Sequence, residues 1–317
     1  MESQNSKGKG NRKSRSKKNA VFHYTNSEGL IGIIKSNRLW STAKHCTNDS
    51  SEFKYALGTV MYELIFHEIS SKFKNKKDCA ITASNLSGKL TNLLLDGLFE
   101  KFLNFITCFT AVSDKDKEED KLKNSYDNGV LSQWRGYGKD GGYAIEFYKK
   151  EIAEACKTTA QGVLDKISYG STSRNIYAGV LREKFLAPLI ESFDSLDQLK
   201  AFTGKLSIHN VEGLDKDMII PMWKMVAFTK NPHFKEENEY RILNLSNALD
   251  CKFYSRNGFI IPYVELNFDI NPFISRIIVG PSQRIDGRVE SVKMLLKSEN
   301  LDLDIEVTRS AIPFEKG

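Results

Sequence analysis

The sequence has no apolar run that approaches the roughly 20 residues needed to cross a bilayer. Its first residues lack the apolar stretch of a secretory signal peptide, so we expect a cytoplasmic protein with no membrane contact. Its five cysteines are scattered without a Cys-x-x-Cys pair, which predicts reduced thiols rather than a disulfide framework or a zinc site. No Walker sequence is present, and no Gly-x-Gly-x-x-Gly directly follows a predicted strand and opens a helix, so a Rossmann or P-loop nucleotide site is not predicted.

Apolar residues are plentiful all the same. They make up 40% of the 317 residues and include 19 Phe and 12 Tyr, which is ample for a packed core. Long helical patterns lie early in the chain and strand patterns are spread through it without regular alternation, which predicts the α+β class. We expect a mixed, mostly antiparallel central sheet with flanking helices. Strands are predicted at 21–24, 105–109, 142–147, 163–169, 240–245, 259–264, 274–279 and 303–307, and helices at 27–37, 51–73, 86–103, 222–228 and 288–297.

Positive charge is concentrated at the N-terminus. Residues 1–20 hold seven basic residues and one acid, and so carry the whole formal net charge of +6. The basic residues are Lys7, Lys9, Arg12, Lys13, Arg15, Lys17 and Lys18. A segment of this composition cannot bury apolar surface, so we expect residues 1–20 to form a disordered arm before one domain at 21–317, with a helical insertion near 173–206. The arm either contacts nucleic acid phosphates or serves as a solubilising tail.

Two polar clusters lie in the first part of the chain. His23-Tyr24-Thr25 leaves a predicted strand just before a helix, where the Thr25 hydroxyl is placed to cap that helix. Asn48, Asp49 and Glu52 stand at a loop-to-helix junction, where such a pattern is also typical of an N-cap.

Two further clusters lie later. Trp134 and Tyr137 are three apart on a glycine-flanked segment, which suits either a stacking wall for a base or a pair of core aromatics. In a strand, Glu237, Glu239 and Arg241 project from one face, as a surface ion-pair ladder or as part of a site in a cleft with His23.

In these four clusters the sequence resembles a large, mainly prokaryotic family, domain of unknown function 2971. The matching motifs are His23-Tyr24-Thr25, Asn48-Asp49-x-x-Glu52, Trp134-x-x-Tyr137 and Glu237-x-Glu239-x-Arg241, with a closing strand at 277–281. The segment after Asn48 lacks the family's usual proline, and the helical stretch near 173–206 is a second departure. The family name itself implies no function.

A more distant resemblance implies one. The opening is similar to that of the ADP-ribosyltransferase fold at His23, Thr25, Leu30, Ile33, Ile34 and Leu39. In that fold a first-strand His contacts a ribose of NAD, an aromatic ring stacks on nicotinamide and a late-strand Glu completes the site. The resemblance implies catalytic roles for Glu239, then Glu237, with His23; NAD contacts by His23, Tyr24, Thr25, Trp134, Tyr137, Tyr143 and Arg241; and support from Asn48, Asp49 and Glu52. Breaking the nicotinamide–ribose bond creates oxocarbenium character, which a fixed carboxylate stabilises.

The first hypothesis is therefore an NAD-dependent ADP-ribosyltransferase or NAD glycohydrolase, of the kind used as a toxin or phage-defence effector. Its acceptor would be nucleic acid, reached through the basic arm, and a toxin would require a neutralising partner protein. One alternative is a Mg²⁺-dependent nuclease with Asp49, Glu52, Glu237 and Glu239 as oxygen ligands. Another is a binding or regulatory module in which the clusters form a structural polar network.

Overall fold

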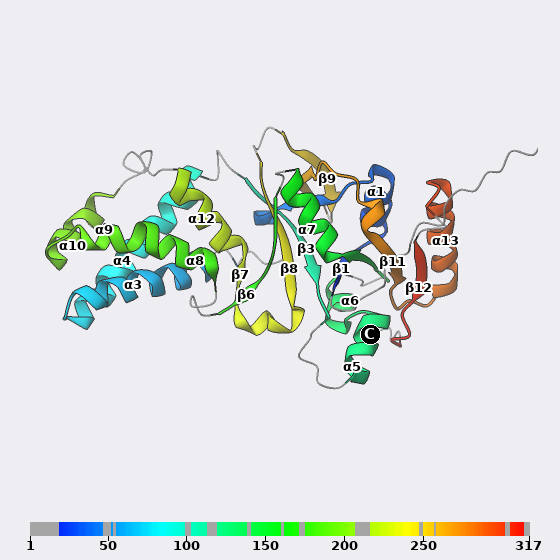
Figure 1. Ribbon diagram of the computed structural model, residues 1–317, viewed down its shortest axis with the longest axis horizontal. Coiled ribbons are helices and arrows are strands. Elements are labelled where there is room, and N and C mark those ends of the chain that lie inside the picture. Colours follow the sequence, from blue (N-terminus) through cyan, green and yellow to red (C-terminus); the bar gives the residue numbers. More distant parts are fainter. Residues whose placement is uncertain are drawn as a thin grey trace, which may run out of the picture.

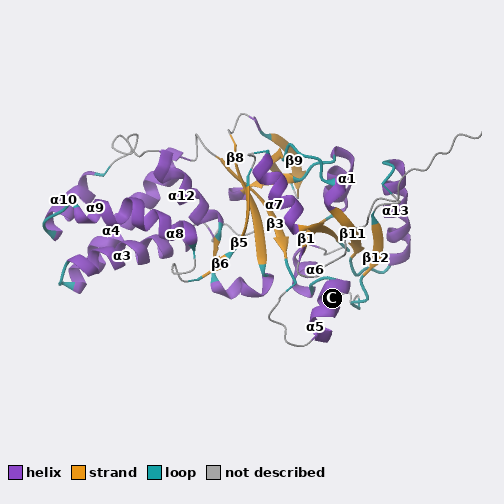
Figure 2. Ribbon diagram, in the orientation of Figure 1, coloured by secondary structure: helices purple, strands orange, loops and turns teal. Residues whose placement is uncertain are grey.

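The computed structural model describes residues 19–46, 52, 55–98, 103–112, 119–137, 141–159, 162–170, 175–206, 216–246, 250–256, 258–301 and 305–313. The molecule is elongated, with a lobe of helices at one end and a lobe built on a β-sheet filling the rest (Figure 1). Colouring by secondary structure separates the two lobes clearly (Figure 2). The predicted basic arm lies outside the described residues up to residue 18, and the first strand already begins at Ala20.

The sheet lobe has the predicted α+β architecture with a mixed, mostly antiparallel sheet. Ten strands form it, and among the described strands its parallel pair is β11 with β12. Along the main path the order is β12-β11-β4-β1-β3-β2-β10-β9, and β8 pairs with both β3 and β5. The strands are β1 (Ala20–Thr25), β2 (Trp40–Ala43), β3 (Leu103–Thr110), β4 (Tyr143–Tyr148), β5 (Val163–Lys166), β8 (Glu239–Ser246), β9 (Lys252–Arg256), β10 (Phe259–Glu265), β11 (Ile274–Val279) and β12 (Glu306–Arg309).

The sheet divides at β3. One edge of β3 pairs with β8 along its whole length, from Leu103 to Thr110. The other edge is shared, because β1 pairs with its end at Thr110 and β2 pairs nearer its start at Phe105 and Ile106. Strands β1 and β2 therefore diverge from the same edge, and the backbone of Cys108 lies between the two pairings.

Helices cover both faces of the sheet. On one face α1 (Ser27–Ser36), α7 (Lys149–Thr158) and α13 (Ile285–Ser298) pack their apolar residues on the strands. Helix α1 buries Leu30, Ile33 and Ile34 and ends at Asn37 in the left-handed conformation, as the sequence predicts. On the opposite face α5 (Glu119–Asn128) and α6 (Leu131–Tyr137) pack against β1, β4 and β11.

The helical lobe comes from two distant parts of the chain. The first part holds a π-helical segment (Tyr55–Val60), α3 (Met61–Lys72) and α4 (Lys76–Leu98). The second holds α8 (Ile176–Leu181), a π-helical turn (Arg182–Leu186), α9 (Ala187–Glu191), α10 (Leu196–Lys205) and α12 (Lys216–Ala227). Both parts bury residues in one shared core, so the helices predicted near 173–206 form half of a lobe with its own hydrophobic centre. No helix in the described part of the chain is both long and apolar enough to cross a membrane.

Several boundaries differ from prediction. The strand predicted at 163–169 divides into β5 and β6 (Ser168–Tyr169), and β6 pairs with β7 (Thr229–Lys230) in a separate two-stranded sheet. Helix α4 begins ten residues before the predicted start at Leu86, and α12 begins before Pro221, which it contains. Proline is normally excluded from helix interiors, so the sequence predicted that α12 begins only after Pro221.

Candidate functional site

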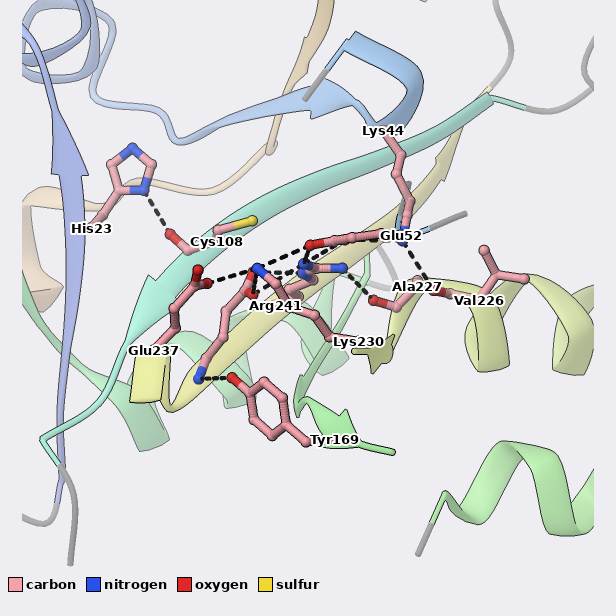
Figure 3. A network of polar contacts seen from close by, with 11 residues as sticks. His23, Lys44, Glu52, Cys108, Tyr169, Val226, Ala227, Lys230, Glu237 and Arg241 are labelled. Atoms are coloured by element: carbon pink, nitrogen blue, oxygen red, sulfur yellow. Dashed lines mark hydrogen bonds and ion pairs between the residues drawn. The ribbon is translucent and has the colours of Figure 1, made fainter. Parts of the chain in front are cut away.

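Strand β8 begins with two charged residues that point to the same side of the sheet. Glu239 is its first residue and Arg241 its third, so both project from one face. Arg241 is 2% exposed and its Nε donates to Glu239 Oε1 at 2.5 Å. Its second terminal nitrogen donates to Glu52 Oε2 at 2.8 Å, and its first donates to the carbonyl of Ala227 at 2.9 Å. This guanidinium thus joins the sheet to the helical lobe (Figure 3).

Two lysines complete the charge balance. Lys230, in β7, places Nζ 2.9 Å from Glu52, 2.6 Å from Glu237 and 3.1 Å from Glu239. Lys44, just after β2, places Nζ 3.5 Å from Glu52 and donates to the carbonyl of Val226 at 3.0 Å. Among the described residues the cluster therefore contains three carboxylates and three cations, which we call the ion network: Lys44, Glu52, Lys230, Glu237, Glu239 and Arg241.

Burial and charge act in opposite directions on these groups. Burial alone raises the pKa of Glu239, but the charges of Arg241 and Lys230 outweigh it and hold that pKa at about 2. The pKa of Glu52 is lowered in the same way, with Arg241 and Lys44 overcoming burial. Burial, assisted by the charge of Arg241, lowers the pKa of Lys44 to about 8. Both carboxylates are therefore ionised at neutral pH.

The two carboxylates of the Glu-x-Glu motif differ in access. Glu239 is 5% exposed at its side chain, and both its oxygens accept hydrogen bonds from Arg241 or Lys230. Glu237 is 25% exposed and bonds to Lys230 through Oε2. Glu237 ends a 3₁₀ turn (Pro232–Glu237) and precedes Asn238, which adopts the left-handed conformation. The sequence predicted Glu237 in a strand, but it lies just before β8. Burial raises its pKa, with Lys230 opposing the rise.

Polar groups of three other elements surround this pair. Tyr169, in β6, accepts a hydrogen bond from the backbone N–H of Glu239 at 2.8 Å. Tyr137, at the end of α6, is 42% exposed. Its pKa is raised by burial of the hydroxyl and then by the charges of Cys108, Glu239 and Glu237. Tyr137 is thus the aromatic residue of the predicted set whose hydroxyl is affected by the charges of the ion network.

His23 lies near the network but approaches it from the other side of β3. Its Nδ1 lies 2.9 Å from the carbonyl oxygen of Cys108, at the point where β1 and β2 diverge (Figure 3). Phe22 pairs with Thr110, and Thr110 pairs with Glu239, so these three share a face and His23 belongs to the opposite one. Its ring packs against Phe109 with 5.8 Å between centroids. Strand β3 lies between the strands of His23 and Glu239, and their side chains project from opposite faces, so these two residues do not face one cleft as the sequence suggested.

Other residues predicted to contact NAD lie in the core. Trp134 is 4% exposed, donates from Nε1 to the carbonyl of Asn128 at 2.9 Å and packs edge-on against Tyr24 at 4.8 Å. Tyr143 is also buried, in β4. Thr25 ends β1, and the side chain of Asn26, rather than that of Thr25, caps α1. Of the two interpretations of Trp134, the geometry favours a core residue that anchors α6 and thereby Tyr137.

Close packing around Trp134 leads to a test of this anchoring. A Cβ added at Gly280 would lie 2.8 Å from both the Trp134 ring and the carbonyl of Gly142. Gly280→Ala is therefore expected to lower the free energy of unfolding by about 1–3 kcal/mol in urea denaturation, the usual range for overpacking. Gly287→Ala is the matched control, since a Cβ there meets nothing within 4 Å. Equal stability of the two variants would contradict the tight packing of Trp134.

The sequence did not reveal every member of the network. Glu52, predicted as a supporting residue, is central to it, whereas Asn48 and Asp49 lie outside the described residues. Lys44 and Lys230 were missed, because each stands alone among polar residues of ordinary pattern. The available signal was one of charge balance: Glu52, Glu237 and Glu239 could not be buried together beside Arg241 without further cations.

The nuclease alternative places Mg²⁺ on Asp49, Glu52, Glu237 and Glu239, of which Asp49 lies outside the described residues. Among the described residues no group of three or more His, Cys, Asp or Glu side chains is placed to hold a metal ion. The carboxylates of the network already pair with three cations, so a Mg²⁺ ion would have to displace at least one of them.

The family prediction has support from known sequences. Residues 133–242 match the family model described as "Protein of unknown function (DUF2971)". The matched segment runs from α6 into β8 and includes Tyr137, Lys230, Glu237, Glu239 and Arg241. A comparison with curated proteins gives no match.

Proposed function

We propose that the protein is an NAD-dependent ADP-ribosyltransferase or NAD glycohydrolase in which Glu237 is the carboxylate that meets the ribose. The observation that carries the proposal is the pair Glu237 and Glu239: one is partly open to solvent and the other is fixed in the ionised state. Cleavage of the nicotinamide–ribose bond leaves oxocarbenium character on C1′, and a nearby fixed carboxylate stabilises that charge. Nicotinamide departs with the bond's electron pair, and the acceptor attacks C1′ and loses its proton.

Lys230 and Tyr137 have roles in this proposal. Lys230 bridges Glu237 and Glu239, so the buried carboxylate holds the accessible one in position. Tyr137 offers its exposed ring to nicotinamide beside these carboxylates. His23 has no part in this step, because it projects from the opposite face of the sheet, where its Nδ1 contacts the carbonyl of Cys108. Consumption of NAD is an activity suited to a toxin or phage-defence effector.

The test is nicotinamide release from labelled NAD by the wild-type protein across pH 4 to 8. Release requires ionised Glu237, so it is full above the pKa of that group and is lost as the pH falls through it. Because burial raises this pKa above its ordinary value of 4.5, the acid limb is expected above pH 4.5. Absence of release at every pH, together with no thermal shift on adding NAD, would overturn the proposal.

A second candidate is a non-catalytic module in which the ion network braces the two lobes. It is favoured by the complete hydrogen bonding of Glu239 and by the contacts of Arg241 and Lys44 to carbonyls of α12. This candidate predicts that charge-neutral variants of the network change the free energy of unfolding. It also predicts that neither the wild type nor the variants release nicotinamide from NAD. The release assay therefore separates the two candidates directly.

A further inference from the structure

The hairpin of β9 and β10 carries large apolar side chains that the core does not cover. Strand β9 ends the strand order of the sheet. Phe253 is 64% exposed, Phe259 71% and Ile260 75%, in contrast to the buried strands β4 and β11. Exposed aromatic residues gathered on one element are typical of a binding surface.

The register of the hairpin places aromatic and basic side chains on one of its faces. Lys252 pairs with Tyr263, Tyr254 with Ile261, and Arg256 with Phe259, so these side chains share a face. Phe253 pairs with Pro262 and projects from the opposite face. We call the first of these the aromatic-basic face.

Trp40 extends the aromatic-basic face onto β2. Its ring lies 4.6 Å from that of Tyr263 and 6.0 Å from that of Tyr254, measured between centroids. Lys252 bonds to Glu265 at 2.7 Å, yet its side chain remains 58% exposed. Tyr263 and Ile261 are buried, at 8% and 4% exposed, so the ring of this face that is open to a base is Phe259, with the half-buried Tyr254 and Trp40. An exposed ring paired with Arg256, with Lys252 at the other end of β9, resembles the stacking sites that bind single-stranded nucleic acid, where bases stack and cations contact phosphates.

The face adjoins the candidate active site. Arg256 donates from a terminal nitrogen to the carbonyl of Cys46 at 3.1 Å. Cys46 belongs to the short turn that begins with Lys44, a member of the ion network. A strand of nucleic acid lying along this face would therefore pass the end of the ion network at which Lys44 pairs with Glu52.

The charges of the aromatic-basic face favour a polyanion over a second copy of this chain as its binding partner. A second copy pairing antiparallel along β9, with the two-fold axis at Tyr254, would bring Lys252 opposite Arg256 of the other copy, and like charges directly opposite destabilise such a pair. A polyanion is attracted by both residues and by the seven basic residues within residues 1–20. We propose that the aromatic-basic face binds single-stranded nucleic acid and presents it as the acceptor of the ADP-ribosyl group. The acceptor role rests on the proposed function, whereas binding does not.

The test measures binding without NAD. The full-length protein is titrated into a fluorescein-labelled deoxythymidine oligomer of about 16 nucleotides, and anisotropy is followed at two salt concentrations. Phe259→Ala is expected to weaken binding about fivefold to a hundredfold, the range for loss of one stacked base. Phe253→Ala is the matched control, because it removes an equally exposed ring from the opposite face, and its affinity is expected to equal that of the wild type.

Each contrary result is decisive. No binding by the wild type, or equal binding by the two variants, overturns the proposed surface. A dimer seen by light scattering that Phe259→Ala dissociates would overturn it in favour of a second copy. In the NAD assay with the oligomer present, Phe259→Ala should lose label transfer while nicotinamide release persists. If the wild-type protein releases no nicotinamide, the proposed function is overturned, whereas the conclusion about nucleic acid binding is unaffected.

Discussion

Replacing Arg241 with alanine is expected to lower the free energy of unfolding by about 3–5 kcal/mol, the range for removing one partner from a buried ion pair. Arg241 is 2% exposed and bonds to both Glu52 and Glu239, which are nearly as buried. Without it, two carboxylates with lowered pKa values would lose the charge that chiefly keeps them ionised. Urea denaturation followed by circular dichroism measures the change.

Two further variants identify the cause. Arg309→Ala breaks an exposed pair with Asp286 and is expected to cost less than about 1 kcal/mol. Arg241→Met combined with Glu239→Gln removes one buried charge of each sign, leaves Glu52 and Glu237 paired with Lys44 and Lys230, and should recover part of the lost stability. If this double variant is no more stable than Arg241→Ala, the loss comes from packing around the guanidinium and not from unpaired charge.

The spacing of apolar residues predicted much of the fold, because it indicates helices and strands that bury one face. The spacing of Leu30, Ile33 and Ile34, with Asn37 after them, predicted α1, and the apolar run at 274–279 predicted β11. Pattern failed where tertiary contacts decide. Strand β2 has four residues and is held by pairing with β3 and β10, and β9 is too exposed to show the expected alternation.

The site was predicted in part for a similar reason. Glu239 and Arg241 are two apart in a strand, so their shared face could be deduced from the sequence. The side of β3 on which His23 lies depends on the pairing of Phe22 with Thr110, which no local pattern contains. The choice between Trp134 and Tyr137 also depended on distant residues, since Gly280 and Tyr24 enclose Trp134 and leave Tyr137 partly exposed.

Glu237→Gln is expected to lower nicotinamide release by about 10² to 10³-fold, with the melting temperature nearly unchanged. The magnitude is that for removing one group that stabilises charge in a transition state. Glutamine keeps an oxygen for the hydrogen bond from Lys230 but removes the negative charge that opposes the oxocarbenium ion. Stability should hold because a quarter of this side chain is exposed.

Two neighbouring carboxylates serve as controls for this variant. Glu236→Gln changes an exposed residue one position earlier and should retain full release. Glu239→Gln removes a charge fixed between Arg241 and Lys230, so it should lower both release and stability. If Glu239→Gln abolishes release while Glu237→Gln does not, Glu239 is the carboxylate that meets the ribose, in the order that the sequence resemblance implied. If both variants match the wild type in release, neither carboxylate acts on NAD, and the brace between the lobes is the remaining function of the network.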